Sequence, residues 1–395
     1  MAKGSIRDRG DGKWQLEVDL GMKLNHLTGK KKRQKKYKTV KAKGKREAEK
    51  MLAQFVTEVT ADSYFEPEKM MFVDFVEKHW FPKYAKKHLA PRTLDTYLLH
   101  INNRILPASQ ALRIDQVKTI HIVDFLDNLS EPGLRKDGKE DVLSPATIAY
   151  HHRILKNIFS RAVEWKIIKE NPVVGVKKPK ETPKEIEVYD EEEAALLLNR
   201  LDKELLHWRV MIKIAITTGL RRSELLGLEW KHIDLEEGII AVKQGLTYSK
   251  SSGFQIGELK TKNSKRTVTI PSSLIPELKK LKTKKQQERI AAEELWNGGD
   301  YFFLFSDFKG IPFHPTSVTT WWRRFINRHK LKYINFHALR HTSATLLINQ
   351  GIHAKTISSR LGHADIKTTM NTYGHVLEKA DREAANSLDT LFKKG

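Results

Sequence analysis

The second half of the chain contains an ordered series of cationic, imidazole and phenol side chains that suits chemistry on a phosphodiester. In chain order, the series is Arg221, Lys260, His337, Arg340, His363 and Tyr373. Guanidinium and ammonium groups can hold a phosphate and stabilise the negative charge that grows on its oxygens during transfer. An imidazole can move a proton, and a phenol whose ionised form is favoured by nearby cations can attack phosphorus. The series can therefore cut a phosphodiester without a metal ion.

The first arginine lies in the segment TTGLRRSELLGLEWKHID (217–234). Arg221 and Glu224 are three residues apart, so they share one face of the helix that this segment predicts. Gly219 allows a tight turn at the start of that helix. An isolated pair of this kind is most often a surface ion pair. Here the apolar residues that follow predict a buried helix start, which favours an arginine that serves a ligand.

The lysine lies in GELKTKNSKRTVTIP (257–271), at the end of a predicted strand and before a polar turn. A lysine in such a turn is ordinarily only solvated. Lys262 and Lys265 lie in the same loop as Lys260 and stay open as alternatives for the same role.

The segment NFHALRHTSATLLINQG (335–351) predicts a helix that ends near Gly351. His337 and Arg340 share one face of it by their spacing of three residues. His337 and His341 have the spacing of the two zinc histidines in H-E-x-x-H, but Ala338 replaces the glutamate of that motif. A zinc site is therefore disfavoured, and a buried structural histidine stays as the alternative.

The segment ISSRLGHADIKTTMNTYGHV (357–376) carries the last two members of the series. We expect Gly362 to end one helix, His363 to follow in the turn, and Asp365 to begin the next helix. Tyr373 lies near the end of that second helix. Most single tyrosines are core or surface aromatics, but the small polar neighbours of this one favour an exposed phenol.

Composition indicates a polyanionic partner. The 395 residues suffice for two or three domains, and an apolar fraction of 39% can form real cores. The 71 basic and 48 acidic residues give a net charge of +23, for which nucleic acid is the default partner, although anionic membranes attract similar proteins. The chain has no cysteine, which excludes disulfides, thiolate zinc sites and cysteine nucleophiles.

The ends and apolar runs of the chain favour a cytoplasmic location. The segment MAKGSIRDRG carries charges without the apolar stretch of a signal peptide. No run approaches the roughly 18 apolar residues that span a bilayer.

Residues 1–65 predict a small separate module. Trp14, Leu16, Val18 and Leu20 alternate with polar residues, as in a half-buried strand, and residues 46–60 have the period of an amphipathic helix. Between them, residues 29–46 contain eleven Lys and Arg residues and no acid, which favours DNA contact over a merely solvated loop. The predicted DNA-binding residues are Lys30, Lys31, Lys32, Arg33, Lys35, Lys36 and Lys38.

The rest of the chain predicts a mainly α protein with small β elements. Residues 70–175 have the pattern of helices, one of which begins with Ser144 as N-cap and Pro145 at its first position. Residues 171–185 predict an exposed linker that is rich in proline and lysine. From 186 onward the pattern is mixed, with β-branched runs at GIIAVKQGLTY and KRTVTIP that predict a hairpin or small sheet.

Five motifs together resemble the tyrosine recombinase family, also called the phage-integrase family. They are TGLRRSELLGL, LKTKNSKR, HALRHTSATLL, LGH and TMNTYGH, and they occur in this order. Within the family, the chain most resembles integrases of temperate phages and integrative conjugative elements, over its whole length. The resemblance implies an N-terminal α+β arm-type DNA-binding domain (1–65), an all-α, SAM-like core-binding domain (70–175) and a mixed α/β catalytic domain (186–395).

The resemblance also implies a role for each member of the series. Arg221 and Arg340 resemble the two arginines that clamp the scissile phosphate. His337 resembles the histidine that assists proton transfer, and His363 resembles a further hydrogen-bond donor to phosphate.

Three further positions carry roles by the same resemblance. Tyr373 resembles the nucleophile that forms a 3′-phosphotyrosine bond, and Lys260 resembles the lysine that protonates the departing 5′-oxygen. Glu224 resembles an acidic position that orients its neighbours.

The function implied is site-specific recombination that integrates and excises a mobile element, with no cofactor or metal. The implied partner is double-stranded DNA at core and arm attachment sites, bound by a homotetramer, and no membrane is implied as a partner. Whether an excision factor and a host DNA-bending protein take part stays open. Two alternatives are a type IB topoisomerase-like enzyme and an inactive DNA-binding regulator of the same fold.

Overall fold

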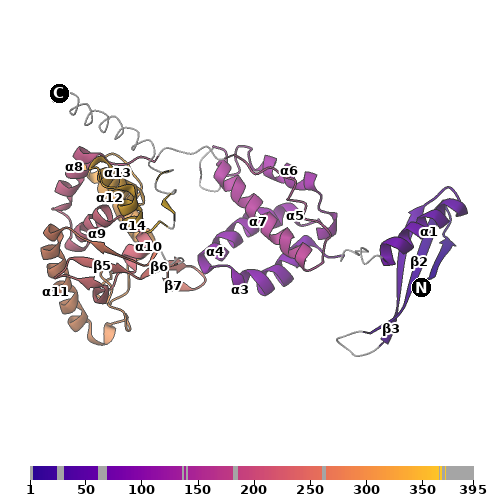
Figure 1. The fold of residues 1–395 in the computed structure, drawn as a ribbon, viewed down its shortest axis with the longest axis horizontal. Helices are drawn as coiled ribbons and strands as arrows, with labels where there is room; N and C mark the ends of the chain where they lie inside the picture. The colour runs from indigo at the N-terminus through magenta and orange to yellow at the C-terminus, as the bar shows by residue number, and fades with distance from the viewer. Residues whose placement is uncertain are drawn as a thin grey trace, which may run out of the picture. The chain divides into compact units, whose positions relative to one another are not determined.

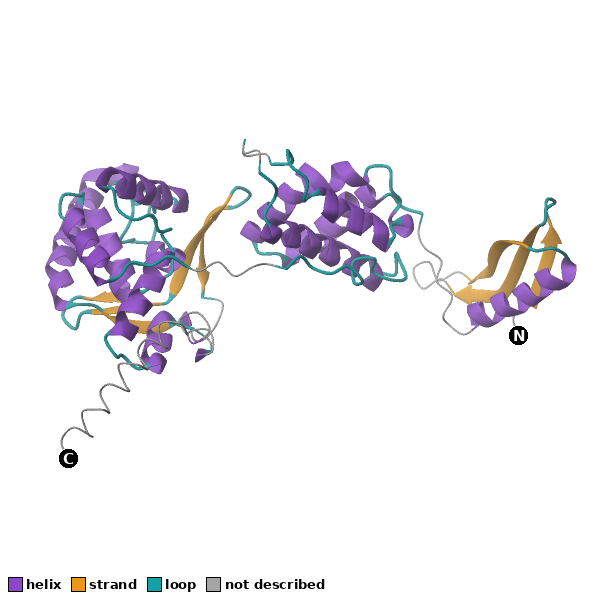
Figure 2. Cartoon of the chain, turned by 90° about the horizontal axis from the view of Figure 1, so that it is seen from above, coloured by secondary structure: helices purple, strands orange, loops and turns teal. Residues whose placement is uncertain are grey.

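The computed structural model describes residues 3–24, 31–60, 69–135, 138, 141–180, 186–259, 264–363, 365–366 and 370 (Figures 1 and 2). Contacts divide the chain into two compact units, one of Met1–His88 with Tyr97–Glu181 and the other of Leu89–Thr96 with Thr182–Gly395. This division does not separate residues 1–65 from 70–175, so the three predicted domains stay a prediction. Within the described ranges, no helix is both long and apolar enough to cross a bilayer.

The N-terminal elements form a three-stranded antiparallel sheet with one helix against it (Figure 1). The elements are β1 (Lys3–Asp8), β2 (Lys13–Leu24), β3 (Lys31–Lys41) and α1 (Lys45–Thr60). Leu16 and Val18 of β2 are fully buried against Phe55 and Val59 of α1. The predicted alternation of the strand and the predicted helix face are therefore both confirmed.

The basic run is largely a strand and not a loop, because residues 31–41 pair with β2 in the centre of the sheet. Three of its cations form ion pairs inside this part of the chain: Arg33 with Asp19 (2.7 Å), Lys35 with Glu17 (2.6 Å) and Lys38 with Glu58 (3.1 Å). The positive charge of the run is therefore partly neutralised before any DNA is bound.

Helices account for nearly all regular structure between residues 69 and 180, as the sequence predicts. In order they are α2 (Phe72–Asp74), the π-helical η1 (Phe75–Ala85), α3 (Lys86–His88), α4 (Pro91–His100), the π-helical η2 (Ile101–Ile105), α5 (Leu106–Ser109), η3 (Ile114–Gln116), α6 (Thr119–Asn128) and α7 (Pro145–Glu164). The predicted start of α7 is confirmed, because the Ser144 side chain accepts a hydrogen bond from the Thr147 backbone N–H at 3.3 Å.

The segment after α7 is less exposed than predicted. Val173 is fully buried, and the Val176 carbonyl oxygen lies 3.1 Å from Nε2 of His152 in α7. The first part of the predicted linker therefore packs on the helices, because its valines can cover apolar surface that the prolines and lysines around them cannot.

The second unit combines helices with two small sheets. Its helices are α8 (Glu191–Leu201), α9 (Leu206–Thr218), α10 (Arg222–Leu226), η4 (Trp230–His232), η6 (Ser272–Leu274), α11 (Ile275–Ala292), η7 (Glu293–Leu295), α12 (Pro315–His329), α13 (Ala338–Asn349) and α14 (Ala354–Leu361). Its strands are β4 (Ile233–Asp234), β5 (Ile239–Val242), β6 (Gln244–Ser249), β7 (Gly253–Glu258) and β8 (Arg266–Thr269).

The strands belong to two antiparallel sheets, which refines the single predicted pairing. β5 lies between β4 and β8 in one sheet, and β6 pairs with β7 in a separate hairpin that extends from the body of the unit (Figure 2). Ile240 and Val268 face each other in the first sheet, and both are buried. The β-branched run of residues 239–249 is thus divided between two partners.

The core of this unit centres on α9, which packs against α11 and α13. Val210, Met211 and Ile214 of α9 are fully buried, together with Phe325 of α12. This core fixes the C-terminal end of α9, where the residues of the candidate site begin.

Helices α9 and α14 each end at a glycine, and the two helix ends lie close together. α9 ends at Gly219 (φ 64°) and α14 ends at Gly362 (φ 69°), both left-handed conformations that glycine adopts without strain. A Cβ atom on Gly219 would collide with the Leu361 side chain at the end of α14. Both turns match the sequence prediction, and the close approach of the two helix ends explains why Gly219 needs to be glycine.

We predict that Gly219→Ala destabilises the protein more than Gly351→Ala does. Both glycines have positive φ after a helix, but a Cβ on Gly351 would meet nothing within 4 Å. The backbone strain costs about 1 kcal/mol in either variant, and overpacking adds roughly 1 to 3 kcal/mol at Gly219 alone. Urea unfolding followed by circular dichroism measures both, and equal midpoints in the two variants would contradict the close contact.

Candidate active site

Four members of the series lie at or near helix ends and gather at one place in the second unit. Arg221 is the residue before α10, His337 is the residue before α13, and Arg340 lies in the first turn of α13. His363 follows the end of α14. The positive charges of Arg340 and Arg221 act on both histidines, which indicates that the four side chains share one site.

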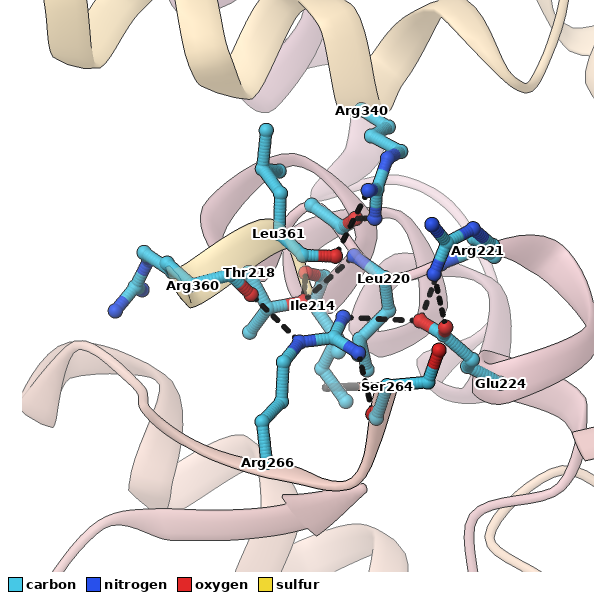
Figure 3. A network of polar contacts seen from close by, with 11 residues as sticks. Ile214, Thr218, Leu220, Arg221, Glu224, Ser264, Arg266, Arg340, Arg360 and Leu361 are labelled. Atoms are coloured by element: carbon cyan, nitrogen blue, oxygen red, sulfur yellow. Dashed lines mark hydrogen bonds and ion pairs between the residues drawn. The ribbon is translucent and has the colours of Figure 1, made fainter. Parts of the chain in front are cut away.

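A buried carboxylate holds two arginines together (Figure 3). Glu224 is 1% exposed, and its two oxygens accept from Arg221 Nη1 at 2.7 Å and from Arg266 Nη2 at 2.9 Å. The Arg221 backbone N–H also donates to Glu224, at 2.9 Å. Arg221 and Glu224 therefore form a largely buried ion pair and not a surface one, as the predicted buried helix start implies.

The carboxyl of Glu224 is held in its charged form. Burial by itself would raise its pKa, but the hydrogen bond and charge of Arg266, and then the contacts with Arg221, lower the pKa below its ordinary value. A buried carboxylate that lost these partners would be costly, so the charge of Glu224 and the positions of the two arginines depend on each other.

Arg266 is a site residue that the sequence analysis did not single out. Its side chain is only 6% exposed. The period of a strand could have found it, because Arg266 is two residues before the buried Val268 and four before the buried Ile270. A cation on the inward face of a strand is rare unless it is paired.

Arg340 is buried, at 3% exposed, and is fixed by backbone carbonyl groups. Its Nη1 donates to the Gly219 carbonyl oxygen at 2.7 Å, and its Nη2 donates to the Leu361 carbonyl oxygen at 2.8 Å. Both carbonyls lie at helix ends that lack intrahelical partners. These two bonds fix the orientation of the guanidinium group.

His337 and His341 lie with their rings 5.2 Å apart and nearly perpendicular. Burial away from water, and then the charges of Arg340 and Arg221, lower the pKa of His337. Burial, the neighbouring His337 and Arg340 lower the pKa of His341 to about 4. Among the residues that the structure describes, no group of three or more histidine and acidic side chains could hold a metal ion.

His363 is a neutral imidazole beside cations. Its backbone N–H donates to the Ser358 carbonyl oxygen at 3.1 Å, which fixes the turn after α14. Burial, followed by the charges of Arg340 and Arg221, lowers the pKa of the imidazole to about 4. At neutral pH the ring can therefore donate one hydrogen bond without adding to the positive charge of the site.

A cleft of about 400 Å³ opens beside these residues, and Arg221, Arg222, Asn335 and His337 are part of its wall. Its polar groups are mostly hydrogen-bond donors, which suits a bound anion. The arrangement can hold a phosphate group and place neutral imidazoles next to it.

Two members of the series, Lys260 and Tyr373, lie outside the described residues, and so does Lys262. Lys265 is exposed just before β8. The choice among the three lysines, and the assignment of the tyrosine, therefore stay predictions.

Comparison with known proteins identifies the family. Residues 187–380 match the phage integrase family, and residues 71–130 match the phage integrase N-terminal SAM-like domain. A tyrosine recombinase XerC-like protein of Caldanaerobacter subterraneus is 32% identical over 329 residues, which are 79% of this chain and 81% of that protein. The ICEBs1 integrase of Bacillus subtilis is 31% identical over 290 residues, which are 71% of this chain and 73% of that protein.

Solved structures show the same fold. The Tn1549 transposon integrase in complex with circular intermediate DNA matches with a TM-score of 0.60 and 24% identity, over 81% of this chain and 99% of that one. A lambda integrase tetramer bound to a Holliday junction matches with a TM-score of 0.50 and 18% identity, over 91% of this chain and 95% of that one.

At 24% and 18% identity, the solved structures support the fold alone. The family assignment comes from the two family models and from the sequence relatives. Because two relatives above 30% identity are matched over more than two thirds of their own length, this chain belongs to the phage integrase family of tyrosine recombinases, enzymes that break and rejoin DNA.

Proposed function

We propose that the chain integrates and excises a mobile element by site-specific recombination through a 3′-phosphotyrosine intermediate. The observation that carries this proposal is that the charges of Arg221 and Arg340 act on both His337 and His363 and lower their pKa values, while Arg221 and His337 form part of the wall of one cleft. Guanidinium donors fixed by Glu224 and by helix-end carbonyls can meet the non-bridging oxygens of a phosphate without reorganising.

In the proposed reaction, the phenolate oxygen of Tyr373 attacks the scissile phosphorus. A bond forms between this oxygen and phosphorus while the bond to the 5′-oxygen of the next nucleotide breaks, and Lys260 gives a proton to that oxygen. The tyrosine ester keeps the phosphodiester energy, so a 5′-hydroxyl from another strand can reverse the step without ATP. Arg221 and Arg340 stabilise the negative charge on the phosphoryl oxygens in both directions.

The proposed partner is double-stranded DNA at core and arm attachment sites, bound in a homotetramer. Residues 1–65 would bind arm sites, whereas residues 70–175 and 186–395 would bind the core sites. The net charge of +23 supports a polyanionic partner. The proposed arm contacts keep the basic residues predicted above, although Arg33, Lys35 and Lys38 already pair with carboxylates.

We place the reaction in the bacterial cytoplasm, on nucleoid DNA. A recombination assay measures the joining of two paired attachment sites by the purified protein. Adding an excision factor or a host DNA-bending protein to this assay shows whether either one increases the yield of joined product. The same assay distinguishes the alternatives, because a type IB topoisomerase would relax supercoils without joining paired sites, and an inactive regulator would bind DNA without cutting it.

Replacing Tyr373 by Phe should abolish the covalent protein–DNA adduct while DNA affinity changes by less than about 2-fold, since only the attacking oxygen is removed. The probe is a duplex that joins the two ends of the element, taken from the DNA that flanks the gene, with a nick that traps the adduct. Denaturing gel electrophoresis measures the adduct and a mobility-shift assay measures affinity. A Phe variant that still forms the adduct would show that another residue attacks.

The affinity for the same duplex should rise as the pH falls from 7.5 to 5.5, and His363→Asn should reduce this rise. The pKa of His363 is about 4 in the free protein, so the ring is neutral. A bound phosphate anion raises that pKa, and binding then takes up a proton, which strengthens affinity by at most about tenfold per pH unit.

The matched control for this titration is His353→Asn, because His353 is exposed and begins α14 with a cap that asparagine can also provide. The control should keep the wild-type pH slope. An unchanged slope in His363→Asn would mean that this imidazole does not gain a proton from the bound phosphate.

A further inference from the structure

The guanidinium of Arg266 connects three separate segments of the catalytic unit (Figure 3). Its Nη2 donates to Glu224 in α10 at 2.9 Å, and its Nε donates to the Arg360 carbonyl oxygen in α14 at 2.7 Å. Its Nη1 donates to the Ser264 carbonyl oxygen, just before β8, at 3.1 Å. One planar side chain thus uses all three of its nitrogens as donors to different elements.

Arg360 returns the contact in the opposite direction. Its Nη2 donates to the carbonyl oxygens of Thr269, at the end of β8, and of Thr217, in the last turn of α9, at 2.8 and 2.7 Å. Strand β8 and helix α14 are therefore joined by two arginines, each of which binds the backbone of the other element. A Cβ atom on Gly362 would lie 2.8 Å from Nη1 of Arg266, so the turn that leads to His363 is built closely around this guanidinium.

We propose that Arg266 is a positioning residue that sets Arg221 through Glu224 and holds the start of β8 against the helix end that precedes His363. Arg266 itself does not touch the scissile phosphate. This inference rests on the proposed function, because it concerns how the same site is held ready for that reaction.

The charge of Arg266 matters as well as its shape. Arg221 is 36% exposed on its side chain, whereas Arg266 is 6% exposed, so Arg266 is the buried partner of the Glu224 carboxylate. Among the residues that the structure describes, the charged and titratable groups that act on Glu224 are Arg221, Arg266 and His337. Arg266 makes the largest contributions that lower the pKa of Glu224, so this pKa should rise without Arg266. Once protonated, Glu224 would hold Arg221 less firmly.

The experiment compares Arg266→Met with Arg360→Met, a matched control that removes the other guanidinium joining β8 and α14, which donates to Thr269 and Thr217 and not to Glu224. The nicked duplex described above is the probe. Arg266→Met should slow adduct formation on the order of 100-fold with nearly unchanged DNA affinity, as expected when a reacting group is misplaced. The acidic limb of its pH–rate profile should move to higher pH, and that of Arg360→Met should stay where the wild type has it.

A double variant tests the route through the carboxylate. If Arg266 acts mainly through Glu224, the rate of Arg266→Met combined with Glu224→Gln should lie close to that of Glu224→Gln alone, far above the rate expected from the product of the two losses. The inference would be overturned if the double variant lost the product of the two single rate losses. It would also be overturned if the acidic limb of the pH–rate profile of Arg266→Met stayed at the wild-type pH.

A measurement without DNA separates this inference from the proposed function. A carboxyl whose pKa is lowered in the folded protein stabilises it above the unfolded pKa, and this stability is lost as the pH falls through the folded pKa. In Arg266→Met that loss should occur at higher pH than in Arg360→Met, in thermal midpoints measured from pH 7 to 3. Arg266→Lys, which keeps the cation, serves if the methionine variant does not fold. Absence of adduct from the wild type would overturn the proposed function alone.

Discussion

The candidate site in the second unit depends on one buried charge, that of the Glu224 carboxylate. Glu224 can stay ionised inside the protein only because Arg221 and Arg266 reach it from two different elements. That requirement fixes the start of α10 relative to the start of β8, although 42 residues separate the carboxylate from Arg266 along the chain. Since Arg221 is also a wall residue of the cleft, the geometry available to a phosphate is determined by this interaction.

The positive charges of the other arginines are offset by backbone carbonyl groups, which limits the repulsion among the cations. Arg340 binds carbonyl groups at the ends of α9 and α14, and Arg360 binds one in the last turn of α9. The C-terminal end of a helix carries partial negative charge and unpaired carbonyl oxygens. Two helix ends that converge at Gly219 and Gly362 therefore offset the guanidinium charges, and the guanidiniums in turn satisfy the helix ends.

The sequence predicts the local features of this fold and misses those that depend on distant contacts. The cap at Ser144, the turn at Gly219 and the helix end at Gly362 follow from neighbouring residues, and the structure agrees with them. The burial of Val173, in contrast, depends on packing against helices elsewhere in the chain. The period of β8 could have placed Arg266 on the inward face, but nothing beside Arg266 in the chain indicates that its partner is Glu224.

Near neutral pH the histidines of the site are neutral, whereas its arginines are charged. Because the pKa of His363 is about 4 and that of His337 is lowered, the positive charge near neutral pH comes from guanidiniums, whose protonation does not change. In the proposed reaction, the imidazoles can then give or accept a proton without first altering the field that a bound phosphate would meet. In the transition state of phosphoryl transfer, the negative charge is spread over three oxygens. Hydrogen-bond donors whose charge and position stay constant therefore stabilise this transition state both in cutting and in rejoining. The lowered pKa values are thus a direct consequence of the same arginine cluster that Glu224 and the helix ends hold in place.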